Sequence, residues 1–332
     1  MSQTPGRPSG DRGGGASGGA LPGGVAGAAA GRDVPGPGAD PRAPLRAEDL
    51  RRLLLAPAGP LARVEVVERT GSTNSDVVNA LRADPASWPD AGVLVAHHQA
   101  GGRGRLGRIW HTPPGAALTC SFVLHPRVPA TSFGWLPLLA GLGTVRAVRA
   151  TAGVPAVLKW PNDVLVPATG EGEGGADGGG GARKLAGILT EVVPGEQPAV
   201  VVGIGVNVGQ TADELPVDSA TSLALAGARH VDRATLLVAL VAALDEVARR
   251  FREAGGDARA SGLADEVAAV CGTLGTRVRV ELPAGGALLG LAQGLADDGG
   301  LEVVDDTGAA HRVLAGDVHH VRAAGDLPSS GA

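Results

Sequence analysis

The stretch KLAGILTEVVPGEQPAVVVGIGVN, residues 184–207, contains two apolar runs that follow each other without a helix between them. The runs 185–193 and 200–206 are short and rich in β-branched residues, which is typical of strands. Two successive strands joined by a short turn favour an antiparallel or mixed sheet over a doubly wound parallel one. The predicted fold class is therefore α+β, built on a mixed β-sheet.

The rest of the central region repeats this pattern of short apolar runs and longer amphipathic segments. Further strands are predicted at 64–67, 92–96, 118–124, 156–159 and 164–166. Helices are predicted at 47–55, 75–83, 136–150, 233–253 and 265–270.

The C-terminal region has a different pattern. From Gly275 onward, short runs at 277–281, 288–292, 301–304 and 311–313 are separated by Gly and Asp turns. Such closely spaced strands predict a small β-barrel, SH3-like in size.

These elements divide the chain into four segments. Residues 1–43 are dominated by Gly, Ala, Pro and Ser and are predicted to be a disordered tail, because they cannot bury enough apolar surface to offset chain entropy. Residues 44–270 form the main domain, 271–323 the small barrel and 324–332 a second tail. No space remains between the first tail and the first strand for a helix-turn-helix domain, so DNA binding is not expected.

Composition excludes several classes of protein. The formal net charge of −5 argues against a general nucleic-acid binder. Cys120 and Cys271 lack metal-ligand spacing and cannot form a disulfide framework. The chain has neither a signal peptide pattern nor a run of about 18 apolar residues. A cytoplasmic protein without a membrane partner is therefore expected.

Two residue types are scarce. Of 29 Lys plus Arg, only Lys159 and Lys184 are lysine, and asparagine occurs only at 74, 79, 162 and 207. Arg cannot replace a compact ammonium group in a tight site. The few Lys and Asn are therefore candidate functional residues, although composition bias alone accounts for Asn79.

The segment Gly101-Gly102-Arg103-Gly104-Arg105-Leu106-Gly107-Arg108 follows a predicted strand. Its glycines let the backbone approach a ligand, and its guanidinium groups suit a carboxylate or phosphate. A solvated basic linker is the alternative, but the apolar pair Ile109-Trp110 argues for an anchored loop. We interpret it as an anion-binding loop that becomes ordered when ligand binds.

Two other segments carry candidate side chains. Gly71-Ser72-Thr73-Asn74 lies between a strand and a helix, where helix capping is the default role, although three polar side chains also suit a neutral ligand. Leu158-Lys159-Trp160-Pro161-Asn162-Asp163 places a lysine, an indole, an amide and a carboxylate on a strand and turn. Lys184 opens the next strand, where its ammonium can reach a pocket rim; a solvated lysine at a strand edge is the commoner case.

Three other motifs do not have the spacing of a phosphate, dinucleotide or metal site. The lysine at 184 is followed by Leu185, so the preceding Gly-rich insertion, 171–182, is no P-loop and is predicted to be a flexible hairpin loop. Gly203-Ile204-Gly205-Val206-Asn207 lacks the third glycine of a dinucleotide fingerprint and is interpreted as a strand edge. The adjacent pairs His97-His98 and His319-His320 do not have the spacing of a metal site.

Taken together and in this order, GSTN, Gln99 followed by GGRGRLGR and Trp110, LKWPND, KLAGIL and GIGVN resemble the catalytic domain of biotin protein ligases. Gly316-Asp317-Val318 resembles part of that family's C-terminal domain. The resemblance covers about residues 45–323. It implies a monofunctional enzyme that forms biotinyl-5′-AMP from biotin and ATP, with Mg²⁺, and transfers biotin to a lysine of a carboxylase's biotin carboxyl carrier protein.

The resemblance also implies roles for residues. The catalytic cations would be Lys184, Arg103 and Arg105. The biotin-binding residues would be Ser72, Thr73, Asn74, Gln99, Arg103, Gly104, Arg105 and Lys184. The nucleotide-binding residues would be Arg108, Trp110, Lys159, Trp160, Asn162, Asp163 and Asn207. No protein-held metal is expected, since Mg²⁺ would arrive with ATP.

Leu106 departs from the family pattern, because many relatives carry a basic or polar residue there, which bears on how tightly the adenylate is retained. The main alternative is a lipoate or octanoate ligase or transferase of the same fold, although an acyl chain would require an apolar tunnel. A non-enzymatic biotin sensor would need a DNA-binding element. A nicotinamide dehydrogenase would rest only on the misfit at Gly203.

Overall fold

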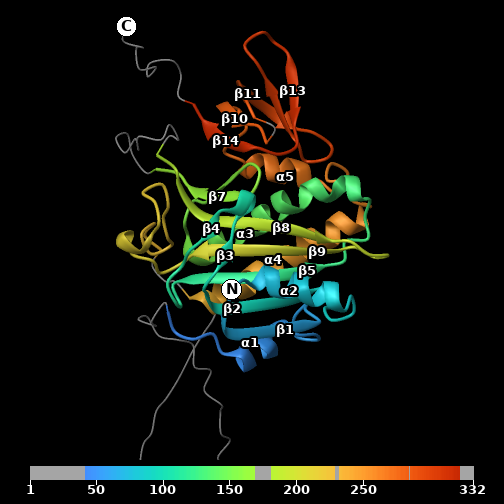
Figure 1. The fold of residues 1–332 in the computed structure, drawn as a ribbon, viewed down its shortest axis with the longest axis vertical. Helices are drawn as coiled ribbons and strands as arrows, with labels where there is room; N and C mark the ends of the chain where they lie inside the picture. The colour runs from blue at the N-terminus through green and yellow to red at the C-terminus, as the bar shows by residue number, and fades with distance from the viewer. Residues whose placement is uncertain (1–41, 169–180, 229–231, 284, 322–332) are drawn as a thin grey trace, which may run out of the picture. The chain divides into compact units, whose positions relative to one another are not determined.

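The computed structural model describes residues 42–168, 181–228, 232–283 and 285–321. A seven-stranded sheet forms the centre of the main domain (Figure 1). Its strands, in spatial order, are β1 (Arg63–Thr70), β2 (Gly92–Gln99), β5 (Ala117–Leu124), β9 (Ala199–Asn207), β8 (Arg183–Val193), β7 (Asp163–Val166) and β6 (Val157–Lys159).

The sheet is mixed. Strands β1 and β2 are parallel and are joined through helix α2 (Thr73–Ala83), as a parallel pair requires a crossover. All other neighbours in this sheet are antiparallel. The α+β fold class predicted from residues 184–207 is confirmed, because those residues form the antiparallel pair β8 and β9.

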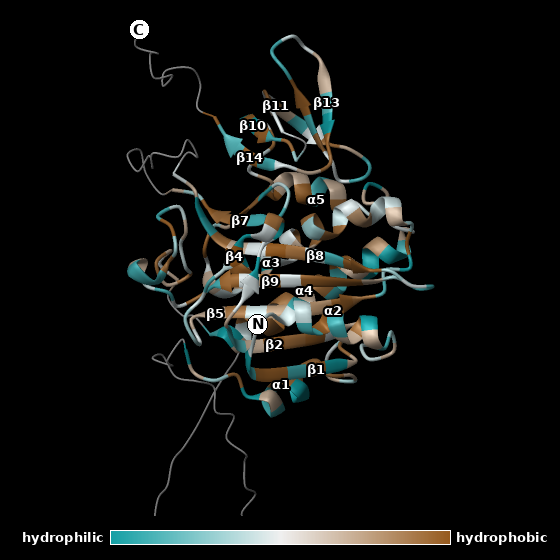
Figure 2. Cartoon of the chain, in the orientation of Figure 1, coloured by the Kyte–Doolittle hydropathy of each residue, from teal (hydrophilic) through white to brown (hydrophobic). Residues whose placement is uncertain are grey.

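Helices cover both faces of the sheet. Helix α2 lies on the near side in Figure 1 and buries Val77, Val78 and Leu81 against residues of β2, β5 and β9. The opposite face packs against α3 (Leu136–Ala152), with α1 (Ala47–Leu54), α4 (Arg233–Glu253) and α5 (Leu263–Val270) completing that layer. The central strands β2, β5 and β9 are largely hydrophobic (Figure 2), and nearly all their residues are buried, as expected for strands covered on two faces.

The C-terminal region is an antiparallel five-stranded sheet. Each strand alternates exposed and buried residues, as in β10 with its buried Val278 and Val280. The prediction of a small β domain is confirmed, and a fifth strand, β14, adds to the four predicted. In spatial order the strands are β13 (Ala310–Val313), β12 (Leu301–Val304), β11 (Ala287–Leu295), β10 (Arg277–Glu281) and β14 (Asp317–His320).

Two indoles connect this sheet to the main domain. Trp135 Nε1 donates a hydrogen bond to the carbonyl of Asp297 at 2.7 Å, and Trp160 Nε1 donates one to the carbonyl of Gly299 at 3.1 Å. Both indoles are buried. The turn at 297–300, between β11 and β12, is therefore fixed to the main domain beside the Trp160-Pro161-Asn162 turn.

Some predicted segments lie outside the described residues: nearly all of the tail 1–43, most of the insertion 171–182, and the tail 324–332. Within the described part of the chain, no helix is long and apolar enough to cross a membrane.

Candidate functional site

A buried polar cluster lies where α2 begins. Ser72 caps the helix, since its hydroxyl accepts a hydrogen bond from the backbone amide of Ser75 at 3.4 Å. Thr73 donates twice to Oε1 of Gln99, from its backbone amide at 2.8 Å and from its hydroxyl at 2.9 Å. Ser72, Thr73, Asn74 and Gln99 are all at most 8% exposed. The four residues assigned to the biotin pocket by resemblance are thus adjacent.

Asn74 lies across strand β9. Its Nδ2 donates to the carbonyl of Leu189 at 3.2 Å and to the carboxylate of Glu191 at 2.9 Å. A Cβ atom on Gly203 would lie 2.3 Å from Oδ1 of Asn74, so only glycine fits there. The interpretation of residues 203–207 as a strand edge is wrong: β9 is a central strand between β5 and β8.

Gly205, the second glycine of β9, leaves room for Trp110, as Gly203 does for Asn74. A Cβ on Gly205 would lie 2.7 Å from Cε2 of the indole, and a Cβ on Gly187 of β8 would touch both Trp110 and Lys184 at 3.4 Å. The indole Nε1 is buried without a hydrogen-bond partner. Trp110 thus covers a flat, side-chain-free area of the sheet, and its indole N–H is unpaired.

The arginine-rich segment forms a hairpin that sequence periodicity did not reveal. Strand β3 (Gly102–Arg103) pairs with β4 (Ile109–Trp110), and a short 3₁₀ turn spans Arg105–Gly107. A Cβ on Gly102 would lie 2.4 Å from the carbonyl oxygen of Trp110, so a residue with a side chain does not fit at this position. Leu106 has φ +56°, an unusual conformation for a residue with a Cβ.

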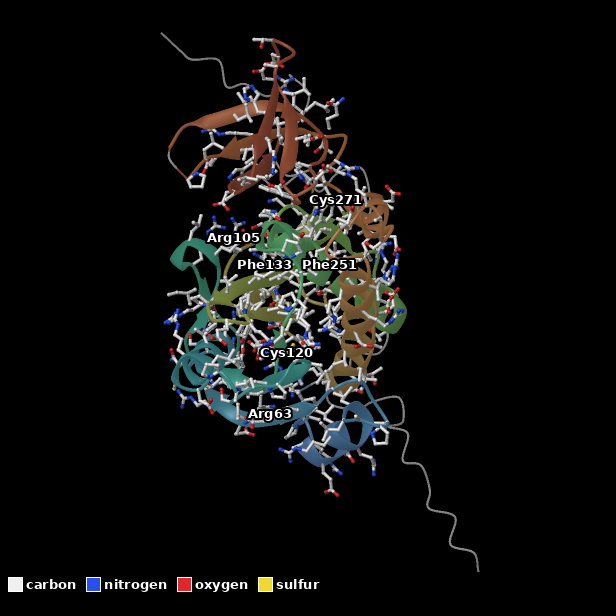
Figure 3. All side chains as sticks on the ribbon, turned by 90° about the vertical axis from the view of Figure 1, so that its right-hand side faces the viewer. Arg63, Arg105, Cys120, Phe133, Phe251 and Cys271 are labelled. Carbon is white, nitrogen blue, oxygen red and sulfur yellow. The ribbon has the colours of Figure 1, made fainter. Side chains whose placement is uncertain are left out.

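The three arginines of this hairpin have different partners. Arg103 is exposed. Nη1 of Arg105 donates to Oδ1 of Asn162 at 3.0 Å, and burial lowers the pKa of Arg105, against the opposing effect of Asp163. Arg108 forms an ion pair with Asp317 of β14. Figure 3 shows Arg105 on the side of the main domain that carries the C-terminal sheet. The hairpin is therefore held at two points.

Both lysines of the chain lie near Asp163, and Lys184 forms an ion pair with it. Nζ of Lys184 lies 2.7 Å from Oδ1 of Asp163 and 5.8 Å from the centre of the Trp110 ring. Lys159 lies opposite Asp163 in the β6–β7 hairpin. Burial lowers the pKa of Lys159, Asp163 raises it, and the positive charges of Lys184 and Arg108 lower it further. This cluster carries more positive charge than one carboxylate can balance.

Three other residues predicted for the site, Asn162, Asn207 and Trp160, are held by hydrogen bonds or by burial. Asn162 Nδ2 donates to the carbonyl of Ile188 at 2.9 Å. The Asn207 amide donates to the carbonyl of Thr221 at 2.9 Å and accepts from Gln210 at 2.8 Å. Trp160 is 1% exposed, so its indole shapes the site and offers little surface to a ligand.

A cavity of about 350 Å³ adjoins this region. It lies between the Trp160-Pro161-Asn162 turn, the edge of β8, the 3₁₀ turn η2 (Ala130–Trp135) and the C-terminal sheet. Its lining residues are Arg105, Thr131, Gly134, Pro137, Trp160, Pro161, Asn162, Ile188, Thr190, Asp298, Gly299, Gly300 and Leu314.

Ser121 is a member of the polar cluster that the sequence did not reveal. Its hydroxyl lies 2.7 Å from Oγ1 of Thr73 and 2.6 Å from Oδ1 of Asn74, and it is fully buried on β5. In sequence it stands within the apolar run 118–124. The one available signal was a polar residue at an interior strand position.

Comparison with known proteins assigns both regions of the chain to a family. Residues 66–208 match the biotin/lipoate A/B protein ligase family, and residues 273–321 match the biotin protein ligase C terminal domain. A Mycobacterium tuberculosis protein named biotin--[acetyl-CoA-carboxylase] ligase is 39% identical over 285 residues, which cover 85% of this chain and 97% of that protein. The chain belongs to the biotin protein ligase family.

Two further relatives match this chain, one in structure and one over half of its sequence. The biotin protein ligase of Aquifex aeolicus, solved in complex with biotin and ATP, superposes with a TM-score of 0.60 at 26% identity, covering 79% of this chain and all of that one. The bifunctional ligase/repressor BirA of Bacillus subtilis is 32% identical over 170 residues. That match covers 50% of this biotin protein ligase family member and 47% of BirA.

Proposed function

We propose that this protein is an ATP-dependent biotin protein ligase that uses the site between the polar cluster, the arginine hairpin and the two lysines. The observation that carries the proposal is the position of Lys184. Its ammonium lies beside the glycine-lined face of β8 and β9, which also holds Asn74, and next to Trp110 and Asp163. A buried polar cluster, an aromatic surface and a set of cations thus adjoin one another.

The first step joins two anions. A biotin carboxylate oxygen attacks the α-phosphorus of ATP, the bond to the β-phosphate oxygen breaks, and pyrophosphate leaves with that electron pair. Positive charge placed where negative charge develops lowers the barrier. Lys184, Arg103 and Arg105 supply that charge as the catalytic cations.

The second step consumes the mixed anhydride. The ε-amine of the acceptor lysine attacks the biotinyl carbonyl carbon, AMP leaves with the electron pair of the broken C–O bond, and the amine loses a proton. The arginine hairpin, when closed over the anhydride, keeps water away until the lysine arrives. No side-chain nucleophile is needed.

The proposed binding residues follow from these positions. Ser72, Thr73, Asn74 and Gln99 contact the ureido ring, and Arg103, Gly104, Arg105 and Lys184 surround the carboxylate. Trp110 offers the open part of its half-buried ring to the nucleotide base. The nucleotide side is completed by Arg108, Lys159, Asn162, Asp163 and Asn207, and the buried Trp160 holds the turn that carries Asn162 and Asp163.

Mg²⁺ is proposed to enter with the nucleotide. Within the described residues there is no group of three His, Cys, Asp or Glu side chains that could hold a metal ion. Phosphate oxygens of ATP are donors that Mg²⁺ prefers, and Asp163 is a carboxylate within the proposed site. When bound, Mg²⁺ neutralises charge on the departing pyrophosphate.

The proposed acceptor is the biotin carboxyl carrier domain of a carboxylase. The Mycobacterium tuberculosis relative is named for such an acceptor, acetyl-CoA-carboxylase. We also propose a division into a catalytic domain, 44–270, and a C-terminal domain, 271–323, and a cytoplasmic location, where carboxylases and ATP are present.

Biotin is favoured over lipoate or octanoate by the pocket itself. An acyl chain requires apolar walls, whereas Thr73, Asn74, Gln99 and Ser121 gather buried oxygen and nitrogen atoms where the ligand is proposed to bind. A hydrocarbon chain bound there would form no hydrogen bonds with these polar groups, so their desolvation would weaken binding.

A labelling experiment tests the proposal. The full chain is incubated with biotin, Mg·ATP and a biotin carboxyl carrier domain, and the carrier is weighed by mass spectrometry. The expected result is a gain of one biotinyl group that requires ATP and the acceptor lysine. A carrier that gains octanoate or lipoate instead, with no biotinyl-adenylate formed, would overturn it.

A further inference from the structure

The segment that follows β9, residues 208–222, holds two residues of the proposed site; we call it the β9 loop. At its far end, the backbone amide of Lys184 donates to the carbonyl of Ser219 at 2.7 Å, and the amide of Thr221 donates to the carbonyl of Lys184 at 2.8 Å. The side-chain amide of Asn207 donates to the carbonyl of Thr221 at 2.9 Å. The conformation of the β9 loop therefore helps to determine where Lys184 and Asn207 lie.

The near end and the middle of the β9 loop contact Arg42. Its Nη2 donates to the carbonyl of Gly209 at 3.1 Å and forms an ion pair with Glu214. Glu214 belongs to the short 3₁₀ turn η3 (Ala212–Glu214), and its carboxylate also accepts the backbone amide of Thr211 at 3.0 Å. The side chains of Arg42 and Glu214 are 34% and 25% exposed. One nitrogen atom of Arg42 thus restrains the loop at two points, one of them between its two ends.

The backbone of Arg42 is itself fixed by a second arginine. Arg233, the first residue of α4, is 1% exposed. Its Nη2 donates to the carbonyls of Ala43 at 2.7 Å and Arg42 at 3.4 Å, and its Nη1 donates to the carbonyl of Ala117 at 3.2 Å. A Cβ on Gly115 would lie 3.0 Å from the carbonyl oxygen of Arg42, so the two backbones pack closely. The last two residues of the predicted tail are therefore packed against the main domain.

We propose that Arg42 is a positioning residue for the nucleotide, acting through the β9 loop to hold Lys184 and Asn207 in place before ATP binds. This inference rests on the proposed function. A loop that is already restrained loses less conformational freedom when a ligand binds, so the ligand binds more tightly. Loss of the contacts to Gly209 and Glu214 leaves the loop to be ordered at the expense of ATP binding.

The effect of Arg42 concerns ATP more than biotin. Asn207 lies on the proposed nucleotide side and is bonded directly to the β9 loop. The polar cluster proposed for biotin lies instead on α2, β2 and β5, where Thr73 donates twice to Gln99. Removing the Arg42 side chain leaves these bonds in place. A change confined to the β9 loop is therefore expected to weaken ATP binding selectively.

The test compares Arg42→Gln with Arg252→Gln in the full chain. Arg252 is the matched control, because its ion pair with Asp90 has similar side-chain exposure, 29% and 27%, and lies near the opposite end of α4 from Arg233. Hydrogen exchange read by mass spectrometry follows residues 208–222. Steady-state turnover with a carrier domain measures the KM for ATP, the KM for biotin and kcat.

Arg42→Gln is expected to speed exchange in the β9 loop roughly tenfold and to raise the KM for ATP roughly fivefold, a modest change typical of a partly exposed ion pair. The KM for biotin and kcat should change less than about twofold. Arg252→Gln should alter neither loop exchange nor either KM. Unchanged loop exchange, an unchanged KM for ATP, or equal increases in the two KM values would each overturn the inference.

A second variant covers the case in which Arg42→Gln disturbs folding. Glu214→Gln removes the charge that faces Arg42 but keeps an acceptor for the Thr211 amide. The chain that carries both substitutions should raise the KM for ATP no further than the stronger single variant, because one interaction is lost only once. Effects that multiply would show that the two residues act separately and would overturn the inference.

The two readouts also separate this inference from the proposed function. A wild-type protein that forms no biotinyl-adenylate would overturn the proposed function, and with it the role of Arg42 toward ATP. Loop exchange in Arg42→Gln would still report whether Arg42 restrains the β9 loop. Wild-type ligation together with unchanged kinetics in Arg42→Gln would overturn the inference alone.

Discussion

Nζ of Lys184 lies 2.7 Å from Oδ1 of Asp163, so one of the two lysines of the chain is held by a carboxylate that begins the neighbouring strand. Lys184 is on β8 and Asp163 is on β7, and the two strands are hydrogen-bonded neighbours. The ion pair fixes the ammonium beside Trp110 before any substrate binds. An arriving phosphate would then compete with Asp163 for the same charge.

Replacing Lys184 by Arg tests whether the position of this charge matters. A guanidinium is larger and planar, so it keeps the charge but cannot occupy the place of a compact ammonium. We expect Lys184→Arg to lose adenylation on the order of 100-fold while its thermal unfolding stays close to wild type. Pyrophosphate release measures this, with Arg249→Lys on the exposed side of α4 as control. Near-normal turnover would remove Lys184 from the mechanism.

The glycines of β9 allow a second prediction. A methyl group on Gly205 would lie 2.7 Å from the Trp110 indole and displace it. Gly205→Ala is therefore expected to raise the KM for ATP roughly tenfold and the KM for biotin far less, at a stability cost of about 1–3 kcal/mol. Gly195→Ala is the matched control, since its Cβ would approach nothing closer than 3.7 Å. Steady-state kinetics with each substrate varied in turn measure the two KM values. An equal effect on both would contradict the assignment of Trp110 to the nucleotide.

The sequence predicted elements well where the pattern was local. Helix α4 begins and ends at the predicted residues, Arg233 and Glu253, because its apolar spacing and its Asp232 cap lie within one segment. The hairpin of β3 and β4 was missed because strands of two residues carry no periodicity. Strand β14 was missed because Asp317-Val318-His319-His320 has a single apolar residue.

The site was harder to predict where contacts join distant segments. Gly203 is required by Asn74, which lies 129 positions earlier in the chain. No local pattern contains that relationship, so Gly203 was interpreted from its own strand alone. Ser121 was missed for the same reason, since its partners Thr73 and Asn74 come from α2 and its own strand is apolar. The roles assigned to the catalytic, biotin-binding and nucleotide-binding residues all stay predictions.

The ion pair between Arg108 and Asp317 connects the arginine hairpin to the C-terminal sheet. Because Arg108 is more than half exposed, the pair contributes at most about 1 kcal/mol. Asp317→Asn should free the hairpin, so we expect tryptic cleavage after the arginines of the loop to speed up about two- to fivefold, and high salt to have the same effect on the wild type. Asp306→Asn, which breaks the exposed pair with Arg277 elsewhere in the same sheet, is the control. Equal cleavage rates in the two variants would show that Asp317 does not restrain the hairpin.

His320 gives a prediction about pH. Its Nε2 lies 3.4 Å from Oγ1 of Thr273, and burial, followed by the charges of Lys159 and His319, lowers the pKa of His320 from 6.5 to about 4. The folded protein therefore binds this proton less readily than the unfolded chain does. Stability from this group is complete above pH 6.5, falls as the pH drops from 6.5 to about 4, and changes no further below that.

His320→Gln removes the titrating group and should flatten the fall in melting temperature between pH 6.5 and 4 by roughly a few degrees. His319→Gln is the matched control, because this neighbour is exposed and lies on the outer side of the same strand. Thermal unfolding of the two variants and the wild type across that pH range makes the comparison. A wild-type slope retained in His320→Gln would mean that other groups, and not the half-buried His320, account for the acid sensitivity.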